Sequence, residues 1–460
     1  MEKNTFFNRA RELFTTYCKK CGVDRAVFFG FLTRIIGFSS GTITAILIAS
    51  KFSPEVQGYY YTFLNLLVAQ VFIELGFSTV LIQLAGHEWS KLSIDENGEI
   101  SGDSNALSRL TSIAQITFRW FFAGSIVFVL ILGTGGYLFF SRISVCQVSW
   151  ALPWLTLVIL TAVNMLIMPA WSLLEGCNQV INVYTYRFIQ IFLSSLTLWI
   201  SILLGAGLWT PSFSSAVVII CSLIFLKSTY WKFLKTLIFT RQDINHVNWW
   251  VDIFPFQWRI ALSWISGFLS FNLFTPVLLH YQGAAIAGQM GMTWSIASMI
   301  GLAASSWVYP RVPTFCILIA QNKYRELDEL FYKITKMVVI VTFTITATIW
   351  ALIYLLDFIN HPIARRLLPL RPATFVLIGQ ALQTMTIPAS SYLRAHKKEP
   401  LLLLSMVSAL LLASTVFYAG KYYSAYGISL GYLIISIILN PWVFIIWYRC
   451  RMNWHRDENP

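Results

Sequence analysis

Long apolar stretches separated by short polar ones run through most of the chain. About 20 consecutive apolar residues cross a bilayer as an α-helix. Because the apolar stretches are long rather than short and alternating, they predict helices and exclude a transmembrane barrel. The expected fold is an all-α integral membrane protein with about twelve spans, whose starts lie near Val27, Tyr60, Phe118, Trp150, Val180, Phe213, Arg259, Ala284, Met337, Leu367, Pro400 and Tyr426.

Composition agrees with a membrane protein, since 57% of the 460 residues are hydrophobic and only 12% are charged. The chain carries 33 Lys and Arg against 20 Asp and Glu. Most of the basic residues fall in the two tails and in connections on the same side of the spans, which predicts cytoplasmic termini. We therefore expect anionic membrane lipids, and no nucleic acid, as partners of these basic segments.

One pattern occurs twice, which predicts two related halves. Arg34 is followed 23 residues later by Gln57-Gly58, and Arg259 is followed at the same interval by Gln282-Gly283. Each half would hold six spans, so the two bundles would share one orientation about a pseudo-twofold axis along the membrane normal. The predicted division is an N-terminal lobe with a basic tail over 1–235, a cytoplasmic linker over 236–256 and a C-terminal lobe over 257–460.

Charged residues inside predicted spans are few and costly enough to need a reason. The basic ones are Arg34, Arg119, Arg187 and Arg259, and the acidic one is Glu74. Snorkelling of the long side chain to the interface is favoured for Arg119 and equally open for Arg259. A role facing a hydrated cavity is favoured for Arg34 and Arg187, which lie deeper in their spans.

An excess of positive charge in such a cavity favours an anion, and the planar guanidinium suits phosphate oxygens. Glu74 has two interpretations that the sequence leaves open. It either pairs with an arginine and holds it in place, or titrates as a site of ion coupling. Tyr59, Tyr60 and Tyr61 are interpreted as part of an aromatic belt at the membrane interface.

The sequence offers little for catalysis or cofactor binding. It contains no Walker loop, dinucleotide fingerprint, HExxH motif or nucleophile elbow. The pair Cys18 and Cys21 is a weak metal signal without histidines or a second pair. We therefore expect neither a cofactor nor a metal, and a protein that is not an enzyme.

The chain resembles the Wzx-type polysaccharide and O-antigen flippases of the multidrug/oligosaccharidyl-lipid/polysaccharide exporter superfamily. The resemblance covers nearly the whole chain and depends on the order of several strings: Arg34 to Gln57-Gly58, Glu74-Leu75-Gly76-Phe77, His87 to Leu92, the Pro-Ala pairs at Pro169 and Pro388, and Gly283 to Gln289.

The resemblance implies a V-shaped pair of six-helix bundles that moves a polyprenyl-diphosphate-linked oligosaccharide across a bacterial cytoplasmic (inner) membrane by alternating access. It implies substrate contacts by Arg34, Arg187 and Arg259, with Arg119 as a fourth candidate. The implied partners are the lipid-linked oligosaccharide and polysaccharide polymerase or assembly proteins.

Two alternatives remain open at this point. A cation-coupled multidrug exporter of the same superfamily would share the architecture, but its cavity should favour buried acids over arginines. A membrane-embedded polysaccharide polymerase or ligase would need outward-facing catalytic residues, and one outer loop does gather His361, Arg365, Arg366 and Arg371.

Overall fold

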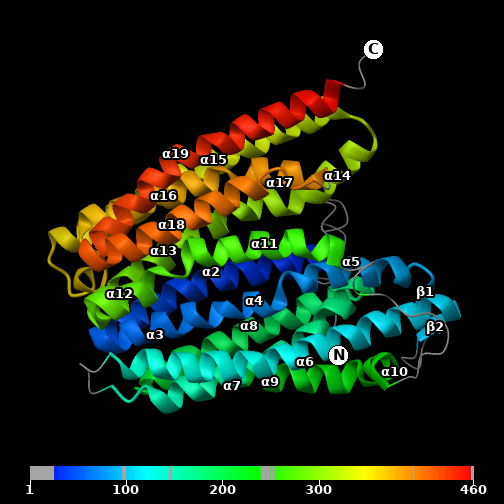
Figure 1. The fold of residues 1–460 in the computed structure, drawn as a ribbon, viewed down its shortest axis with the longest axis horizontal. Coiled ribbons are helices and arrows are strands. Elements are labelled where there is room, and N and C mark those ends of the chain that lie inside the picture. The colour runs from blue at the N-terminus through cyan, green and yellow to red at the C-terminus, as the bar shows by residue number, and fades with distance from the viewer. Residues whose placement is uncertain are drawn as a thin grey trace, which may run out of the picture.

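The protein is almost entirely helical in its computed structural model (Figure 1), which describes residues 25–95, 100–143, 148–239, 249, 254–396 and 398–456. Side chains within helices at 25–35, 38, 239, 255–256, 259, 313, 320 and 455–456 are also outside the description. The predicted all-α fold is confirmed. Cys18 and Cys21 lie outside the described residues.

Among the described residues, nine α-helices begin at or before residue 231. They are α2 (Arg25–Lys51), α3 (Pro54–Leu67), α4 (Val71–Glu74), α5 (Phe77–Trp89), α6 (Ser104–Ser141), α7 (Ala151–Gly176), α8 (Val180–Leu203), α9 (Thr210–Thr229) and α10 (Trp231–Phe239). Local sequence sets some of the helix starts, because side-chain oxygens satisfy free backbone N–H groups there. Ser53 accepts a bond from the Val56 N–H, and Asp103 accepts bonds from Asn105 and Ala106.

The second half of the chain has the same character. Its helices are α11 (Phe254–Phe271), α12 (Phe274–Gln282), α13 (Ala284–Val308), α14 (Val312–Ala320), α15 (Tyr324–Phe358), α16 (Leu370–Met385), α17 (Ile387–Ala395), α18 (Leu402–Tyr422) and α19 (Ser424–Arg456). The only strands in the described part of the chain are β1 (Leu92–Ile94) and β2 (Ile100–Gly102), an antiparallel pair with Ser93 opposite Ser101.

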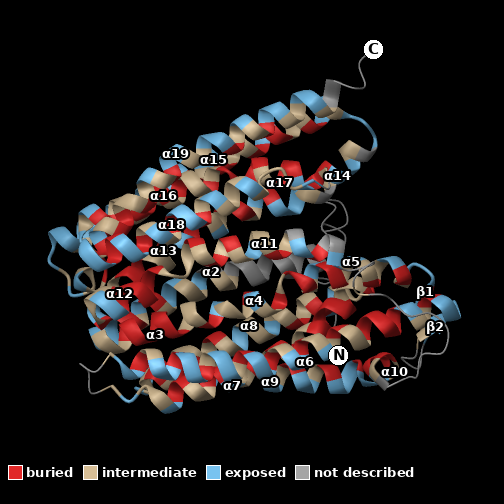
Figure 2. Cartoon of the chain, viewed as in Figure 1, coloured by how far each residue is buried: buried red, intermediate tan, exposed pale blue. Residues whose placement is uncertain are grey.

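Within the described residues, nine helical segments are long and apolar enough to cross a membrane, and the bent pair Pro54–Glu74 and Phe77–Trp89 makes a tenth. Helix α2 and the pair α16–α17 occupy two further predicted positions. The chain is thus a multi-pass membrane protein. Exposed positions run along the long helices (Figure 2), and they include large apolar residues such as Ile131, which is 62% exposed, and Phe343, which is 72% exposed. Lipid is the solvent that such faces require.

The helices form two groups. In Figure 1, α3 to α9 lie in the lower part and α13 to α19 in the upper part, with α11 between them. The groups approach one another at the end where α3 and α12 lie, and separate toward the end where α5 and α14 lie. The described C-terminal end and the β1–β2 hairpin lie at that second end. Which side of a membrane this end faces stays a prediction from the basic residues.

Two polar segments connect helices of the first half and of the boundary region. The stretch from His87 to Ser112 is mostly the end of α5 and the start of α6, joined by the β1–β2 hairpin. The predicted linker over 236–256 begins inside α10, which packs on α6 through a bond from Gln115 Nε2 to the Ile238 carbonyl at 3.2 Å. Residues 240–248 and 250–253 lie outside the described part, so the linker stays a prediction.

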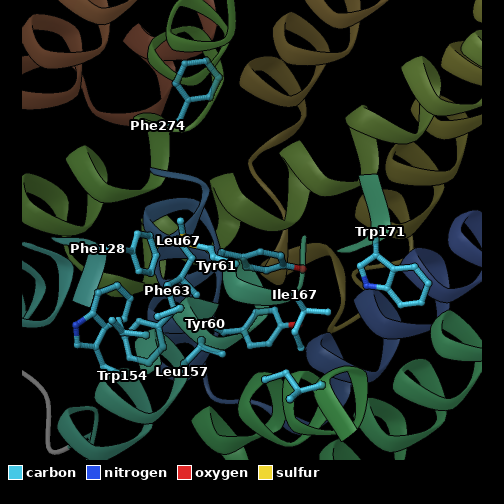
Figure 3. Close-up of a cluster of buried hydrophobic side chains, with 14 of the residues drawn as sticks. Tyr60, Tyr61, Phe63, Leu67, Phe128, Trp154, Leu157, Ile167, Trp171 and Phe274 are labelled. Carbon is cyan, nitrogen blue, oxygen red and sulfur yellow. The ribbon is translucent and has the colours of Figure 1, made fainter. Parts of the chain in front are cut away.

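The aromatic core corrects one interpretation. Tyr59, Tyr60 and Tyr61 are 0%, 4% and 7% exposed, so they belong to the core and not to an interface belt. Figure 3 shows Tyr60 and Tyr61 in the same cluster as Phe63 and Trp154. The ring centroids of Phe63 and Trp154 lie 5.0 Å apart. The reason is tertiary, because α3 is packed against α13 on one side and meets α7 on another. A run of tyrosines alone cannot tell these two environments apart.

Candidate functional site

The two helix groups meet closely where α3 crosses α13. A Cβ added to Gly58 would lie 1.9 Å from the Ala284 carbonyl oxygen, and one added to Gly288 would lie 2.9 Å from the Gly58 nitrogen. Gly291 has the same relation to Tyr61, at 2.4 Å. Backbones approach this closely in membranes only where residues are small. These contacts hold the halves together at one end of the molecule.

Hydrogen bonds reinforce this junction. Buried Gln57 donates from Nε2 to the Gly288 carbonyl at 2.9 Å and to the Arg366 carbonyl at 3.1 Å. Arg366 in turn donates from its guanidinium to the Phe52 carbonyl. The arginines of the outer loop therefore include one that ties the helix groups together. This assigns Arg366 a structural contact where the sequence suggested an outward-facing cluster.

The structure places the two Gln-Gly strings in different surroundings. Gly58 is the fifth residue of α3 and Gly288 the fifth residue of α13, and these two glycines touch. The sequence paired Gly58 with Gly283 instead. Gln282 lies at the end of α12 and donates to the Gly420 and Lys421 carbonyls within the second group. The repeated Gln-Gly strings thus occupy different places in their helices.

A second contact between the groups lies at the break in the bent span. The backbone turns left-handed at Leu75 (φ 47°) and Gly76 (φ 69°), between α4 and α5. Trp120 Nε1 donates to the Ile73 carbonyl at 2.9 Å, which satisfies an acceptor near the break. Glu74, the last residue of α4, is 6% exposed, and it forms no ion pair with any described side chain. A buried carboxylate beside an interrupted helix is a typical functional position in transporters.

Helix α11 passes directly against this break. A Cβ at Gly76 would lie 2.2 Å from Ile260 Cγ2, and the Phe72 and Phe268 rings are 4.8 Å apart. Trp264, one helical turn from each of Ile260 and Phe268, also approaches Gly76. The three α11 residues recur every fourth position, so they form one apolar face. This face meets the first group of helices.

Arg187 and Glu175 form an ion pair that the sequence did not reveal. The Arg187 guanidinium contacts Glu175 Oε1, with side chains 38% and 13% exposed, and it also lies over the Tyr184 ring at 5.6 Å. Glu175 lies near the end of α7, where its carboxylate reaches Arg187 on α8. Its charge offsets that of Arg187, so the cationic excess is smaller than the sequence suggested. Arg119 is exposed on α6, as snorkelling requires.

Arg34 and Arg259 are placed only by their backbones, because their side chains are outside the description. Arg34 lies in α2, which is joined to α8 by bonds from Ser40 to Ser195 and from Trp199 to Thr44. Arg259 precedes Ile260 in α11. Three candidate arginines are therefore on helices α2, α8 and α11, and the binding role of each stays a prediction.

A polar cavity in the second group was missed by the sequence interpretation. It measures 430 Å³ and lies among α11, α13, α16, α17, α18 and α19. Its lining includes Ser263, Ser266, Ser270, Gln380, Gln383, Thr384, Ser390, Arg394 and Asn440. The available signal was the spacing of Ser263, Ser266 and Ser270, which places three hydroxyls on one face of an apolar helix. That face is distinct from the apolar face of α11 that meets the break.

Two remaining features are a possible metal site and the loop that contains His361 and Arg365. Among the described residues, no group of three His, Cys, Asp or Glu is arranged to hold a metal ion. The outer loop borders a recess of 190 Å³ that includes His361, Arg365 and Asp357. The loop backbone is fixed at Arg365, because Gln289 Nε2 donates to the Arg365 carbonyl oxygen at 3.0 Å.

Comparisons with known proteins supply the fold. No protein-family model matches the sequence, and no curated protein matches it either. An inward-facing multidrug resistance MATE family transporter of the MOP superfamily superposes with a TM-score of 0.67 at 12% identity, over 95% of this chain and 100% of that one. The lipid II flippase MurJ in an inward closed conformation gives 0.63 at 14%, over 93% and 90%.

A MOP superfamily transporter from Pyrococcus furiosus, described as having a binding pocket of reversed polarity, gives a TM-score of 0.56 at 14% identity, over 94% of this chain and 97% of that one. At such low identity these likenesses establish the fold alone. They are all membrane transporters, and none is an enzyme. The chain has the fold of the MOP superfamily transporters, which include both multidrug exporters and a lipid flippase.

Proposed function

We propose that this protein is a flippase that moves a polyprenyl-diphosphate-linked oligosaccharide across a bacterial cytoplasmic membrane by alternating access. The observation that carries the proposal is the set of three arginines within membrane helices, Arg34 on α2, Arg187 on α8 and Arg259 on α11, of which Arg187 is paired with Glu175. Arginine suits diphosphate oxygens, because its fork of donors makes two parallel charge-assisted hydrogen bonds. The fold supports a transporter, and MurJ is an example of a lipid flippase with a similar fold.

In this proposal Arg34 and Arg259 hold the diphosphate while the sugars enter between the helix groups and the prenyl tail remains in lipid. Arg187 contributes a weaker attraction, since Glu175 already balances part of its charge. The tight α3–α13 junction around Gly58 and Gly288 is the contact that opens when the opposite end closes. In alternating access, a site between two rigid bundles opens to only one side of the membrane at a time.

The test is flipping of a fluorescent polyprenyl-diphosphate trisaccharide in proteoliposomes that contain only this protein. We expect transport by the wild type, a loss of at least tenfold in Arg34→Ala and in Arg259→Ala, and a smaller loss in Arg119→Ala. Arg119 serves as the control because it is exposed on α6 and adds a similar charge. Wild-type rates in Arg34→Ala and Arg259→Ala, at matched protein levels, would show that the arginines do not hold the cargo.

A cation-coupled multidrug exporter is the second candidate, and the buried Glu74 is the observation that favours it. A carboxylate in a broken span can attract a lipophilic cation or a coupling ion. Efflux of ethidium from the same proteoliposomes distinguishes the two functions. Ethidium efflux lost in Glu74→Gln, without flipping of the lipid-linked sugar, would establish the exporter.

A further inference from the structure

The polar cavity of the second helix group matches the sugar part of the proposed cargo better than the diphosphate. Its volume of 430 Å³ falls within the roughly 300–1,000 Å³ typical of small-molecule pockets. The described residues that line it include no acid, and Arg394 is the only charged side chain among them. Glu399 pairs with Arg394 at 3.1 Å, so even that charge is offset.

The lining is rich in groups that both donate and accept hydrogen bonds. Ser266 and Ser270 donate to carbonyls of their own helix, at 2.8 Å each, which leaves their oxygens free to accept. Gln380 accepts a bond from the Tyr432 hydroxyl at 3.0 Å through Oε1, which holds its amide in place. Hydroxyls and carboxamides of this kind pair with the hydroxyls of a neutral polyol.

Two polar atoms in this cavity have no hydrogen-bond partner within the described part of the chain. They are Oγ1 of Thr384, a residue 1% exposed, and Nδ2 of the half-buried Asn440. Burying such groups without a partner is unfavourable, so a ligand that supplies partners gains affinity. Phe271 and Tyr309 also border the cavity and add aromatic surface. The combination is typical of sites that recognise uncharged sugars rather than ions.

The cavity is placed where cargo between the helix groups would reach it. Ser263, Ser266 and Ser270 line it from α11, the helix whose opposite face meets the break at Glu74. Arg394, half-exposed and hydrogen-bonded to Ser263 at 3.4 Å, lies at its edge. Arg259 precedes Ser263 by four positions on the same helix, so the arginine position and the hydroxyls share one face of α11, with the arginine nearer its start.

We propose that this cavity is a subsite for the neutral sugar moiety of the cargo, separate from the arginines that hold the diphosphate. The proposal rests on the proposed flippase function and specifies which part of the molecule binds where. It predicts that filling the cavity impairs transport of glycosylated lipid and spares transport of the sugar-free lipid. The diphosphate and the prenyl tail are the same in both lipids.

Gly267 gives a way to fill the cavity with little damage. It lines the cavity and an added Cβ would meet nothing within 4 Å. Gly267→Phe should lower flipping of the polyprenyl-diphosphate trisaccharide of neutral hexoses at least tenfold and leave flipping of polyprenyl diphosphate within twofold. Gly135→Phe is the matched control, because Gly135 is exposed on α6 and also has open space at its Cβ. Equal losses for both lipids, or no loss for either, would overturn the subsite.

A second measurement does not require transport or the bulky variant. Ser390 lines the cavity, and its hydroxyl donates to the Ile387 carbonyl of its own helix. Ser390→Cys keeps a side chain of similar size at this position. In a background without the seven native cysteines, we expect the trisaccharide lipid to slow maleimide labelling of Ser390→Cys at least fivefold. Ser228 is exposed at the end of α9, and Ser228→Cys should be labelled at the same rate with and without the lipid.

The two experiments separate failure of this inference from failure of the proposed function. Protection of Ser390→Cys by the trisaccharide lipid but not by polyprenyl diphosphate supports the subsite, even if no lipid is flipped. Protection of Ser390→Cys by both lipids, or by neither lipid, overturns the sugar subsite. Protection by sodium chloride or by pyrophosphate, added in place of a lipid, overturns it too. Flipping that depends on Arg34 and ignores Gly267→Phe would keep the flippase and reject the sugar subsite.

Discussion

The two halves of the molecule share a helical plan and differ in the chemistry they bury. Each half holds an ion pair, Arg187–Glu175 between α7 and α8 in the first and Arg451–Asp328 between α19 and α15 in the second, but the first half also buries the carboxyl group of Glu74 at a helix break. The second half encloses a cavity of hydroxyls and carboxamides. One scaffold can therefore divide recognition, with the helix break suited to an ionic group and the cavity suited to an uncharged polar one. Helix α11 separates the two regions and presents a different face to each.

The junction where the halves touch is the most sensitive place to test this comparison. Gly58→Ala puts a methyl 1.9 Å from the Ala284 carbonyl, so the backbone of α13 must move. We expect a loss of about 3 kcal/mol or more in the free energy of unfolding, at the upper end for overpacking. Thermal unfolding in detergent measures it. Gly135→Ala, with open space, is the control, and an unchanged Tm for Gly58→Ala would mean that the junction is looser than described.

The ion pair of the first half comes next. Arg187→Ala leaves Glu175, whose side chain is 13% exposed, without its partner. Because Arg187 is 38% exposed, solvent weakens the pair and we expect a loss of about 1–2 kcal/mol in stability. The double variant Glu175→Gln with Arg187→Gln should recover most of the Tm. If flipping recovers with it, Arg187 acts only through folding and does not touch the cargo.

Glu74 tests whether the charge of the first half takes part in transport. Glu74→Gln keeps the shape of the side chain and removes its charge. We expect an unchanged or higher Tm, since burying a charge is unfavourable, and a tenfold slower initial flipping rate, equivalent to about 1.4 kcal/mol in the barrier. Stopped-flow flipping assays with and without an imposed proton or sodium gradient measure this. A wild-type rate under both conditions would reduce Glu74 to a structural role.

The smallest expected effect concerns the second half. Thr384→Val removes a hydroxyl whose oxygen has no partner and keeps the branched shape. We expect stability to stay within about 0.5 kcal/mol or to rise, because no hydrogen bond is lost. Flipping of the trisaccharide lipid should fall about threefold. A clear drop in Tm would indicate that Thr384 already has a structural partner, which would weaken the case for the cavity.

Sequence reasoning located the spans well and the contacts poorly. The predicted starts at Trp150, Val180 and Ala284 lie within one residue of the observed helix starts at Ala151, Val180 and Ala284. The tyrosines of α3 were misplaced at the interface, and Glu175 was not recognised as the partner of Arg187. Hydropathy averages the polarity of residues that are neighbours along the chain, so it carries no information about which helix packs against them. Burial in a membrane protein depends on which neighbouring helix covers each face.

The sequence by itself determined that this protein crosses the membrane many times as helices, because a bilayer leaves a long apolar segment no other way to satisfy its backbone. It also predicted two related halves and a few charged residues within the spans, and both stay predictions. Only the tertiary structure decided that Gly58 faces Gly288 and that Ser266 and Thr384 share one cavity. Those pairings join positions far apart in the chain, and the crossing of whole helices sets them rather than any local pattern.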